Sequence, residues 1–154
     1  MAIAPSNPQI LYAGGGHPEP RYDIAAGNGM YLSDDGGAHW RFAGLAATRH
    51  IGAIVVDPHD ANTVLVGALG HIFGPNDERG VFRTTDGGKT WTKTLFVGSD
   101  TGVVDLAVEP AHPNLVSSTD PASAVIFRAG TRVPARCRTS RRGRCRAMGH
   151  ALPT

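Results

Sequence analysis

The chain contains one eight-residue pattern twice, Ser/Thr-x-Asp-x-Gly-x-x-Trp, at residues 33–40 and 84–91. The aspartate of such a pattern can accept hydrogen bonds from the backbone N–H groups of a turn. The glycine supplies a positive φ that other residues resist, and the tryptophan adds a large apolar ring where the next strand begins. Because each copy follows a short apolar run, each octet predicts the turn of a β-hairpin.

The octets belong to a longer repeat of about fifty residues. Pro5, Pro58 and Pro110 occupy equivalent positions, 53 and 52 residues apart, and Trp40 and Trp91 are 51 residues apart. A unit of this length with four short strand signals is typical of a β-propeller blade. The predicted strands are 10–13, 29–32 and 40–42 in the first unit, 53–56, 63–68, 80–84 and 91–95 in the second, and 103–108 and 115–116 in the third.

The third unit loses this pattern after residue 116. All thirteen acidic residues lie at or before Asp120, whereas eight of the fifteen basic residues lie at or after Arg128. Residues 1–127, with seven basic and thirteen acidic side chains, therefore carry a formal charge of −6, and the remainder carries +8. We predict an all-β fold: residues 1–116 form a partial β-propeller, about two four-stranded blades plus the start of a third, and residues 117–154 form a disordered basic tail.

The joint loss of period, acidic residues and turn signals motivates a hypothesis about the gene: the sequence from about Ser117 comes from a shifted reading frame. Sequencing the gene tests this hypothesis. An intact parental reading frame, with no blade-like continuation encoded in another frame, would contradict it. The alternative is a nucleic-acid-binding arm, because arginine runs bind phosphate. No aromatic residue follows Phe127 to stack on bases, so we do not expect nucleic acid as a partner.

Two cysteines, Cys137 and Cys145, lie in the tail with seven residues between them. They form no Cys-x-x-Cys pair and have no histidine pair at zinc spacing, so we predict no metal site and no cofactor. If the chain is exported, a disulfide between them is one possibility. Residues 1–5 lack the basic and apolar segments of a signal peptide, and no apolar run has the length of a membrane span, so we expect neither and leave the localisation unknown.

The octets resemble Asp-boxes, the signature of BNR repeats in sialidases, xyloglucanase-type glycoside hydrolases and sortilin ectodomains. In that group an Asp-box forms the turn between the third and fourth strands of a blade, away from the active site. The second octet matches the pattern fully, whereas the first has His39 where threonine is usual, which we expect to loosen its turn. The resemblance covers about residues 1–116 and implies a structural role for Ser33, Asp35, Gly37, Trp40, Thr84, Asp86, Gly88, Thr90 and Trp91.

In such a propeller, the loops that join second to third strands, and one blade to the next, surround the face where ligands bind. Here they are residues 14–28, 44–52, 69–79 and 98–102, and segments 48–52 and 70–80 resemble loops of large bacterial sortilin-like BNR proteins. Parent proteins of this family are often exported. The candidate ligand-face residues are Arg49, His50, His71, Asn76, Glu78, Arg79 and Asp100.

A catalytic site is not predicted within this chain. Glycoside cleavage needs two carboxylates about 5–10 Å apart, and no spacing identifies a pair among Asp23, Asp77, Glu78 and Asp100. A sialidase needs an arginine cluster and a tyrosine nucleophile, but Arg21, Arg49, Arg79 and Tyr22 are scattered. Loop charges of this kind are most often solvated or tie a loop to its neighbour, and His50 and His71 can equally hydrogen-bond backbone.

Two functions remain open. In the first, the chain is a non-catalytic segment of a larger propeller that binds a protein, peptide or glycan. In the second, it is a fragment of a sialidase- or xyloglucanase-like glycoside hydrolase without a complete active site. Known propellers have at least about four blades, so we expect further blades or self-association to cover the open ends.

Overall fold

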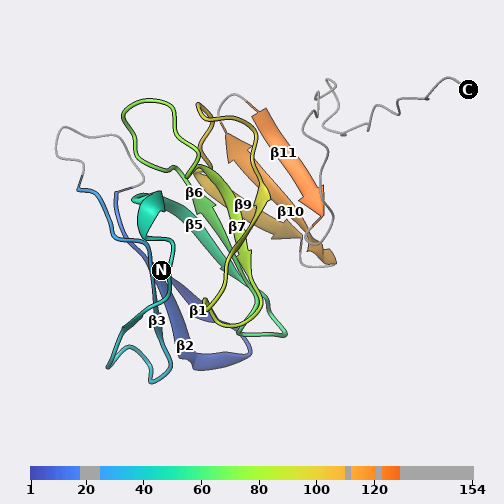
Figure 1. Cartoon of the computed structure of the whole chain (residues 1–154). Helices are drawn as coiled ribbons and strands as arrows, with labels where there is room; N and C mark the ends of the chain where they lie inside the picture. Colours follow the sequence, from blue (N-terminus) through green and yellow to red (C-terminus); the bar gives the residue numbers. More distant parts are fainter. Residues whose placement is uncertain (18–24, 110–111, 121–122, 129–154) are drawn as a thin grey trace, which may run out of the picture.

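The computed structural model describes residues 1–17, 25–109, 112–120 and 123–128 (Figure 1). Within these ranges, eleven strands form three antiparallel sheets, and one short 3-10 helix, η1 (Ala46–Thr48), connects the first sheet to the second. This arrangement confirms the prediction of an all-β, partial β-propeller fold.

The first two sheets repeat the same four-stranded meander. The first consists of β1 (Ala2–Ala4), β2 (Asn7–Gly14), β3 (Met30–Ser33) and β4 (Arg41–Phe42), and the second of β5 (Ile51–Val56), β6 (Val64–Ala68), β7 (Gly80–Thr84) and β8 (Thr92–Leu95). The register repeats as well, because Leu11 pairs with Ser33 and Val64 pairs with Thr84. Each octet therefore begins at the equivalent residue pair between the second and third strands of its sheet. Each also joins the third strand to the fourth, as the sequence predicted.

The third sheet consists of β9 (Asp105–Glu109), β10 (His112–Asp120) and β11 (Ser123–Arg128), paired in the order β11-β10-β9. Strand pairing therefore continues past residue 116, after which the tail was predicted to begin. Ser118, for example, pairs with Leu106 on one side and Val125 on the other. Losing the repeat signature does not remove the backbone N–H and C=O groups that strand pairing uses. Residues 129–154, with both cysteines, lie outside the described residues, so their disorder stays a prediction.

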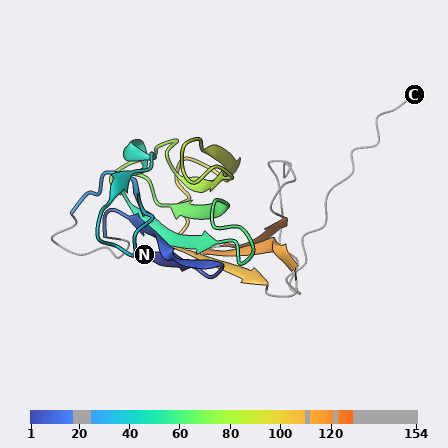
Figure 2. The same cartoon turned by 90° about the horizontal axis from the view of Figure 1, so that it is seen from below.

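Two apolar clusters join the three sheets. In the first, one face of the first sheet packs on the second sheet, through Tyr12, Met30, Leu32, Val64, Val66 and Phe82. In the second, the opposite face of the second sheet packs on β9 and the segment that enters it, through Leu65, Val81, Leu95, Val103 and Leu106. Strand β5 contacts both β1 and β9, so the first strands of the three sheets are neighbours (Figure 2). Each blade thus packs face to face on the next blade in the chain.

Candidate functional site

The turns and loops of the first two blades gather at two opposite ends. At one end, which we call the octet end, each octet lies beside the turn between the first and second strands of its blade. The N–H of Gly36 donates to the carbonyl oxygen of Gln9 at 2.9 Å, and the N–H of Gly87 donates to that of Asn62 at 3.1 Å. The described parts of the loops predicted to form the ligand face lie at the other end, which we call the loop end (Figure 1).

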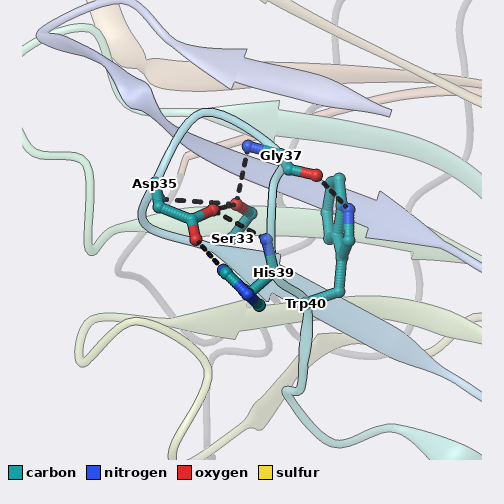
Figure 3. Close-up of polar contacts among 5 residues, drawn as sticks. All are labelled: Ser33, Asp35, Gly37, His39 and Trp40. Carbon is teal, nitrogen blue, oxygen red and sulfur yellow. Dashed lines mark hydrogen bonds and ion pairs between the residues drawn. The ribbon is translucent and has the colours of Figure 1, made fainter.

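The first octet is held together by its aspartate and serine (Figure 3). Asp35 Oδ1 accepts from the Ser33 hydroxyl at 2.8 Å and from the His39 N–H at 2.9 Å, while the Ser33 hydroxyl oxygen accepts from the Gly37 N–H at 2.8 Å. Gly37 has a φ of 96°, a conformation that glycine adopts without strain. The octet thereby satisfies the backbone N–H groups of Gly37 and His39 and closes the turn.

The second octet repeats these contacts. The Thr84 hydroxyl donates to Asp86 Oδ1 at 2.7 Å, and the Thr90 N–H donates to the same oxygen at 2.9 Å. The Gly88 N–H donates to the Thr84 hydroxyl oxygen. The Thr90 hydroxyl donates to Asp86 Oδ2 at 2.6 Å, and His39 Nδ1 lies at the same distance, 2.6 Å, from Asp35 Oδ2. The first turn therefore lacks no contact that the second turn makes at this position, and that His39 loosens it stays a prediction. The imidazole reaches the carboxylate oxygen that the threonine hydroxyl reaches in the second copy.

These contacts lower the pKa of both octet carboxyl groups far below their ordinary value. For Asp35, the hydrogen bond from the His39 N–H is the largest cause, followed by those from the His39 side chain and Ser33. For Asp86, the hydrogen bond from the Thr90 hydroxyl is the largest cause, followed by that from the Thr90 N–H. Both groups are ionised at neutral pH, and their charge is used to hold a turn.

The loops of the loop end are joined by backbone hydrogen bonds. The Gly27 N–H donates to the Arg49 carbonyl oxygen at 2.7 Å, and the Ile51 N–H donates to that of Gly15 at 3.1 Å. Between the second and third units, the Asn76 N–H donates to the Ser99 carbonyl oxygen at 3.0 Å. The described parts of the four predicted loops therefore do lie together.

Within the loop at residues 69–79, Asn76 and Arg79 hold the backbone in place. Asn76 Nδ2 donates to the carbonyl oxygens of His71 at 2.8 Å and Gly74 at 3.2 Å. Arg79 Nη2 donates to the same two oxygens, and its Nη1 donates to the Asp100 carbonyl oxygen at 3.1 Å. Both side chains thus brace the loop, and Asp100 takes part through its backbone.

The other candidates differ in their surroundings. His50 is buried, and this burial lowers the pKa of its imidazole, which is therefore neutral at pH 7. Arg49 is exposed and has a positive φ of 53°, which is rare for a residue with a side chain. His71 and Glu78 lie side by side, with 3.9 Å between Nε2 and Oε2. Asp23, Arg21 and Tyr22 lie outside the described residues.

Phe73 was not among the residues predicted from the sequence. Its ring is 81% exposed at the tip of the loop at residues 69–79, between the two carbonyl groups that Asn76 and Arg79 hold. Exposure of a single phenylalanine leaves no periodic signal, so the sequence could not identify it. The ring adds an apolar surface to a loop end that is otherwise rich in polar groups.

In the part of the chain that the structure describes, no three His, Cys, Asp or Glu side chains gather as metal ligands. No helix in that part is long and apolar enough to cross a membrane.

The fold is similar to that of two solved GH74 enzymes. An ancestral GH74 enzyme matches with a TM-score of 0.54 and 19% identity, over 75% of this chain and 12% of that chain. The GH74 enzyme of Niastella koreensis matches with a TM-score of 0.55 and 20% identity, over 75% of this chain and 16% of that chain. The chain thus spans less than a fifth of either enzyme, and the likeness concerns the fold. No protein-family model matches the chain, and no curated protein matches it in sequence.

Proposed function

We propose that the chain is a non-catalytic segment of a larger BNR-repeat, sortilin-like β-propeller protein, serving as a binding or structural scaffold. Its octets are the Asp-boxes of that repeat, and its loop end contacts a protein, peptide or glycan. The supporting observation is how the loop end uses its polar side chains: Asn76 and Arg79 donate to backbone carbonyl groups. Such contacts hold a surface in shape, which is what a scaffold requires.

Within this proposal, the candidate residues have two roles. Asn76, Arg79 and the buried His50 support the loops, and the Asp100 carbonyl group joins them. Arg49, His71 and Glu78 are exposed or half-buried and are available for ligand contacts. The nine Asp-box residues hold the octet end and do not contact the ligand.

Binding of the full chain to an array of immobilised glycans and peptides tests this proposal. Arg79→Ala removes three donors at the loop end, whereas Lys89→Ala removes an exposed charge in the second octet, at the opposite end. We expect the first variant to weaken binding and the second to bind like the wild type. Equal binding by all three proteins, or weakening by Lys89→Ala alone, would contradict binding through the loop end.

The second candidate function is a fragment of a glycoside hydrolase. It is favoured by the fold similarity to two GH74 enzymes, and carboxylates are present at the loop end in Asp77, Glu78 and Asp100. Glycoside hydrolysis needs one such group as an acid and another as a base or nucleophile.

Release of reducing sugar from xyloglucan distinguishes the two candidates. The scaffold proposal expects no release by the full chain, with or without binding. Release that Glu78→Gln or Asp77→Asn abolishes, and Lys89→Ala leaves unchanged, would instead establish the hydrolase.

A further inference from the structure

One face of the first sheet is apolar and partly exposed to solvent. The ladder places Ile3 opposite Leu11, Ala13 opposite Tyr31, and Tyr31 opposite Phe42. These side chains lie on the face opposite to the buried Tyr12, because alternate residues of a strand point to opposite faces. Ile3 is 55% exposed and Phe42 is 52% exposed, whereas Ala13 and Tyr31 are half-buried and Leu11 is buried. The Tyr31 and Phe42 rings are 5.8 Å apart, edge to face. We call these five residues the open face.

The second sheet shows what covers a face of this kind. By the repeat, Ile3, Leu11, Ala13 and Tyr31 correspond to Val56, Val64, Val66 and Phe82. All four of the latter are buried against the first sheet, and Phe82 is only 9% exposed. Ile3 is therefore solvent-exposed in the first blade, whereas its counterpart Val56 is covered by the neighbouring blade. Leu11 and its counterpart Val64 are buried in both blades.

The two octet tryptophans show the same difference. Trp91 Nε1 donates to the carbonyl oxygen of Ala43 in the preceding blade at 2.6 Å, and its ring packs against the first apolar cluster. Trp40 has no preceding blade among the described residues. Its Nε1 donates instead to the carbonyl oxygen of Gly37 in its own turn at 3.0 Å, and the side chain is 40% exposed (Figure 3).

We propose that the open face, together with Trp40, binds a second copy of this chain in a head-to-tail arrangement. The three sheets stack in the order of the chain. The Tyr12 face of the first sheet covers one face of the second sheet, and the other face of the second sheet covers β9. Among the described residues, one end of the stack is therefore the open face, and the other is the side of the third sheet that faces away from the second sheet. The third sheet of one copy continues the series when it packs on the first sheet of the next copy.

This contact differs from a symmetric dimer interface. It joins two different surfaces, so each added copy presents a new open face, and association continues until a ring closes or a chain of copies forms. The indole N–H of Trp40 can then donate across the contact, as that of Trp91 does within one chain. Apolar contacts of this type are weakly sensitive to salt, unlike contacts made by the basic residues after Arg128.

Sedimentation velocity of the full chain at increasing protein concentration and about 0.5 M NaCl tests the proposal. We expect mass to rise with concentration. Phe42→Ser should weaken the association constant at least about tenfold, because it removes a ring from the contact. Phe73→Ser is the matched control: it removes a more exposed ring at the loop end and should leave association unchanged. Far-UV circular dichroism confirms that both variants remain folded, and Ile3→Ser provides a second variant of the open face.

Fluorescence gives an independent measurement of the same contact. In the Trp91→Phe variant, Trp40 is the sole tryptophan, and its emission should shift to shorter wavelength as mass rises. A chain that stays monomeric at all concentrations overturns the proposal. So does equal weakening by Phe42→Ser and Phe73→Ser, or unchanged Trp40 emission in assembled protein. If the chain is monomeric, a further blade of a longer chain, and not a second copy, would cover the open face.

Discussion

The hydroxyl of Tyr12 donates a hydrogen bond of 2.9 Å to the backbone carbonyl oxygen of Ala61, which lies 49 residues later in the chain. The bond joins β2 of the first blade to the turn before β6 of the second. Tyr12 is completely buried, and this burial raises the pKa of its hydroxyl, which therefore remains protonated and able to donate at neutral pH. The two blades are thus joined by a specific polar contact as well as by apolar packing.

Replacing Tyr12 by Phe should lower the free energy of unfolding by about 1–3 kcal/mol, because the carbonyl oxygen of Ala61 loses its donor in a buried position. Urea unfolding followed by circular dichroism measures the change. Tyr31→Phe is the control, since Tyr31 lies on the open face and contacts Phe42 through its ring. Equal effects of the two substitutions would contradict a role for the Tyr12 hydroxyl.

The His39 side chain should be replaceable by threonine but not by alanine. Thr90 shows that a hydroxyl at this position reaches the aspartate, at the same 2.6 Å as the imidazole. We therefore expect His39→Thr to unfold near the wild-type temperature and His39→Ala to unfold at a lower one. Thermal unfolding of both variants measures the difference. An unchanged melting temperature for His39→Ala would show that the contact between His39 and Asp35 does not stabilise the fold.

Stability should fall in acid because of the octet carboxyl groups. Their folded-state pKa values lie far below the ordinary value of 3.8. A lowered carboxyl pKa stabilises the fold fully above the unfolded pKa, and this contribution is lost as pH falls from about 4 toward the folded value. Urea midpoints between pH 5 and pH 2.5 should therefore fall, and they should fall less steeply in an Asp35→Asn, Asp86→Asn double variant. Equal slopes would contradict this assignment.

Gly88→Ala should destabilise the chain, whereas Gly98→Ala should not. Gly88 has a φ of 82°, and a Cβ added there would lie 3.0 Å from the Cβ of Ala43 in the preceding blade. The backbone strain alone costs about 1–2 kcal/mol. A Cβ at Gly98 would meet no atom within 4 Å. Chemical unfolding of both variants provides the comparison, and a Gly88→Ala protein as stable as Gly98→Ala would be inconsistent with the structure.

Arg79→Ala should loosen the loop end without unfolding the blades. Its guanidinium group donates to the carbonyl oxygens of His71, Gly74 and Asp100. Hydrogen exchange followed by mass spectrometry should show faster exchange in residues 70–79 and 98–102, with the strands of the second sheet unchanged. Faster exchange throughout the second sheet would instead indicate that Arg79 stabilises the whole blade.

Most of the fold could be predicted because its signals are local. The hairpin turns follow from aspartate, glycine and tryptophan at fixed spacing, and β7 spans Gly80–Thr84 as predicted from the apolar run before the second octet. The strand β10 was predicted only over residues 115–116, because the serines and threonine after it carry no apolar alternation. Their pairing depends on neighbouring strands, which no local pattern shows.

The candidate site was predicted as a group of loops but not in its details. Loop positions follow from strand order, so the meeting of the predicted loops at one end could be foreseen. That Arg79 contacts three backbone carbonyl groups could not, since these come from residues up to 21 positions away. The equivalence of His39 and Thr90 was missed because it depends on where the imidazole nitrogen lies relative to Asp35.

The sequence by itself determined the repeat, the turns and the blade type of this protein, because the hydrogen bonds of each octet lie within eight consecutive residues. Only the tertiary structure decided how equivalent residues differ. Trp40 and Trp91 occupy the same position of the repeat, but one donates to its own turn and the other to the preceding blade. The physical reason is that side-chain burial and partners depend on which blade lies against a face, and that neighbour is set by the packing of segments about fifty residues apart.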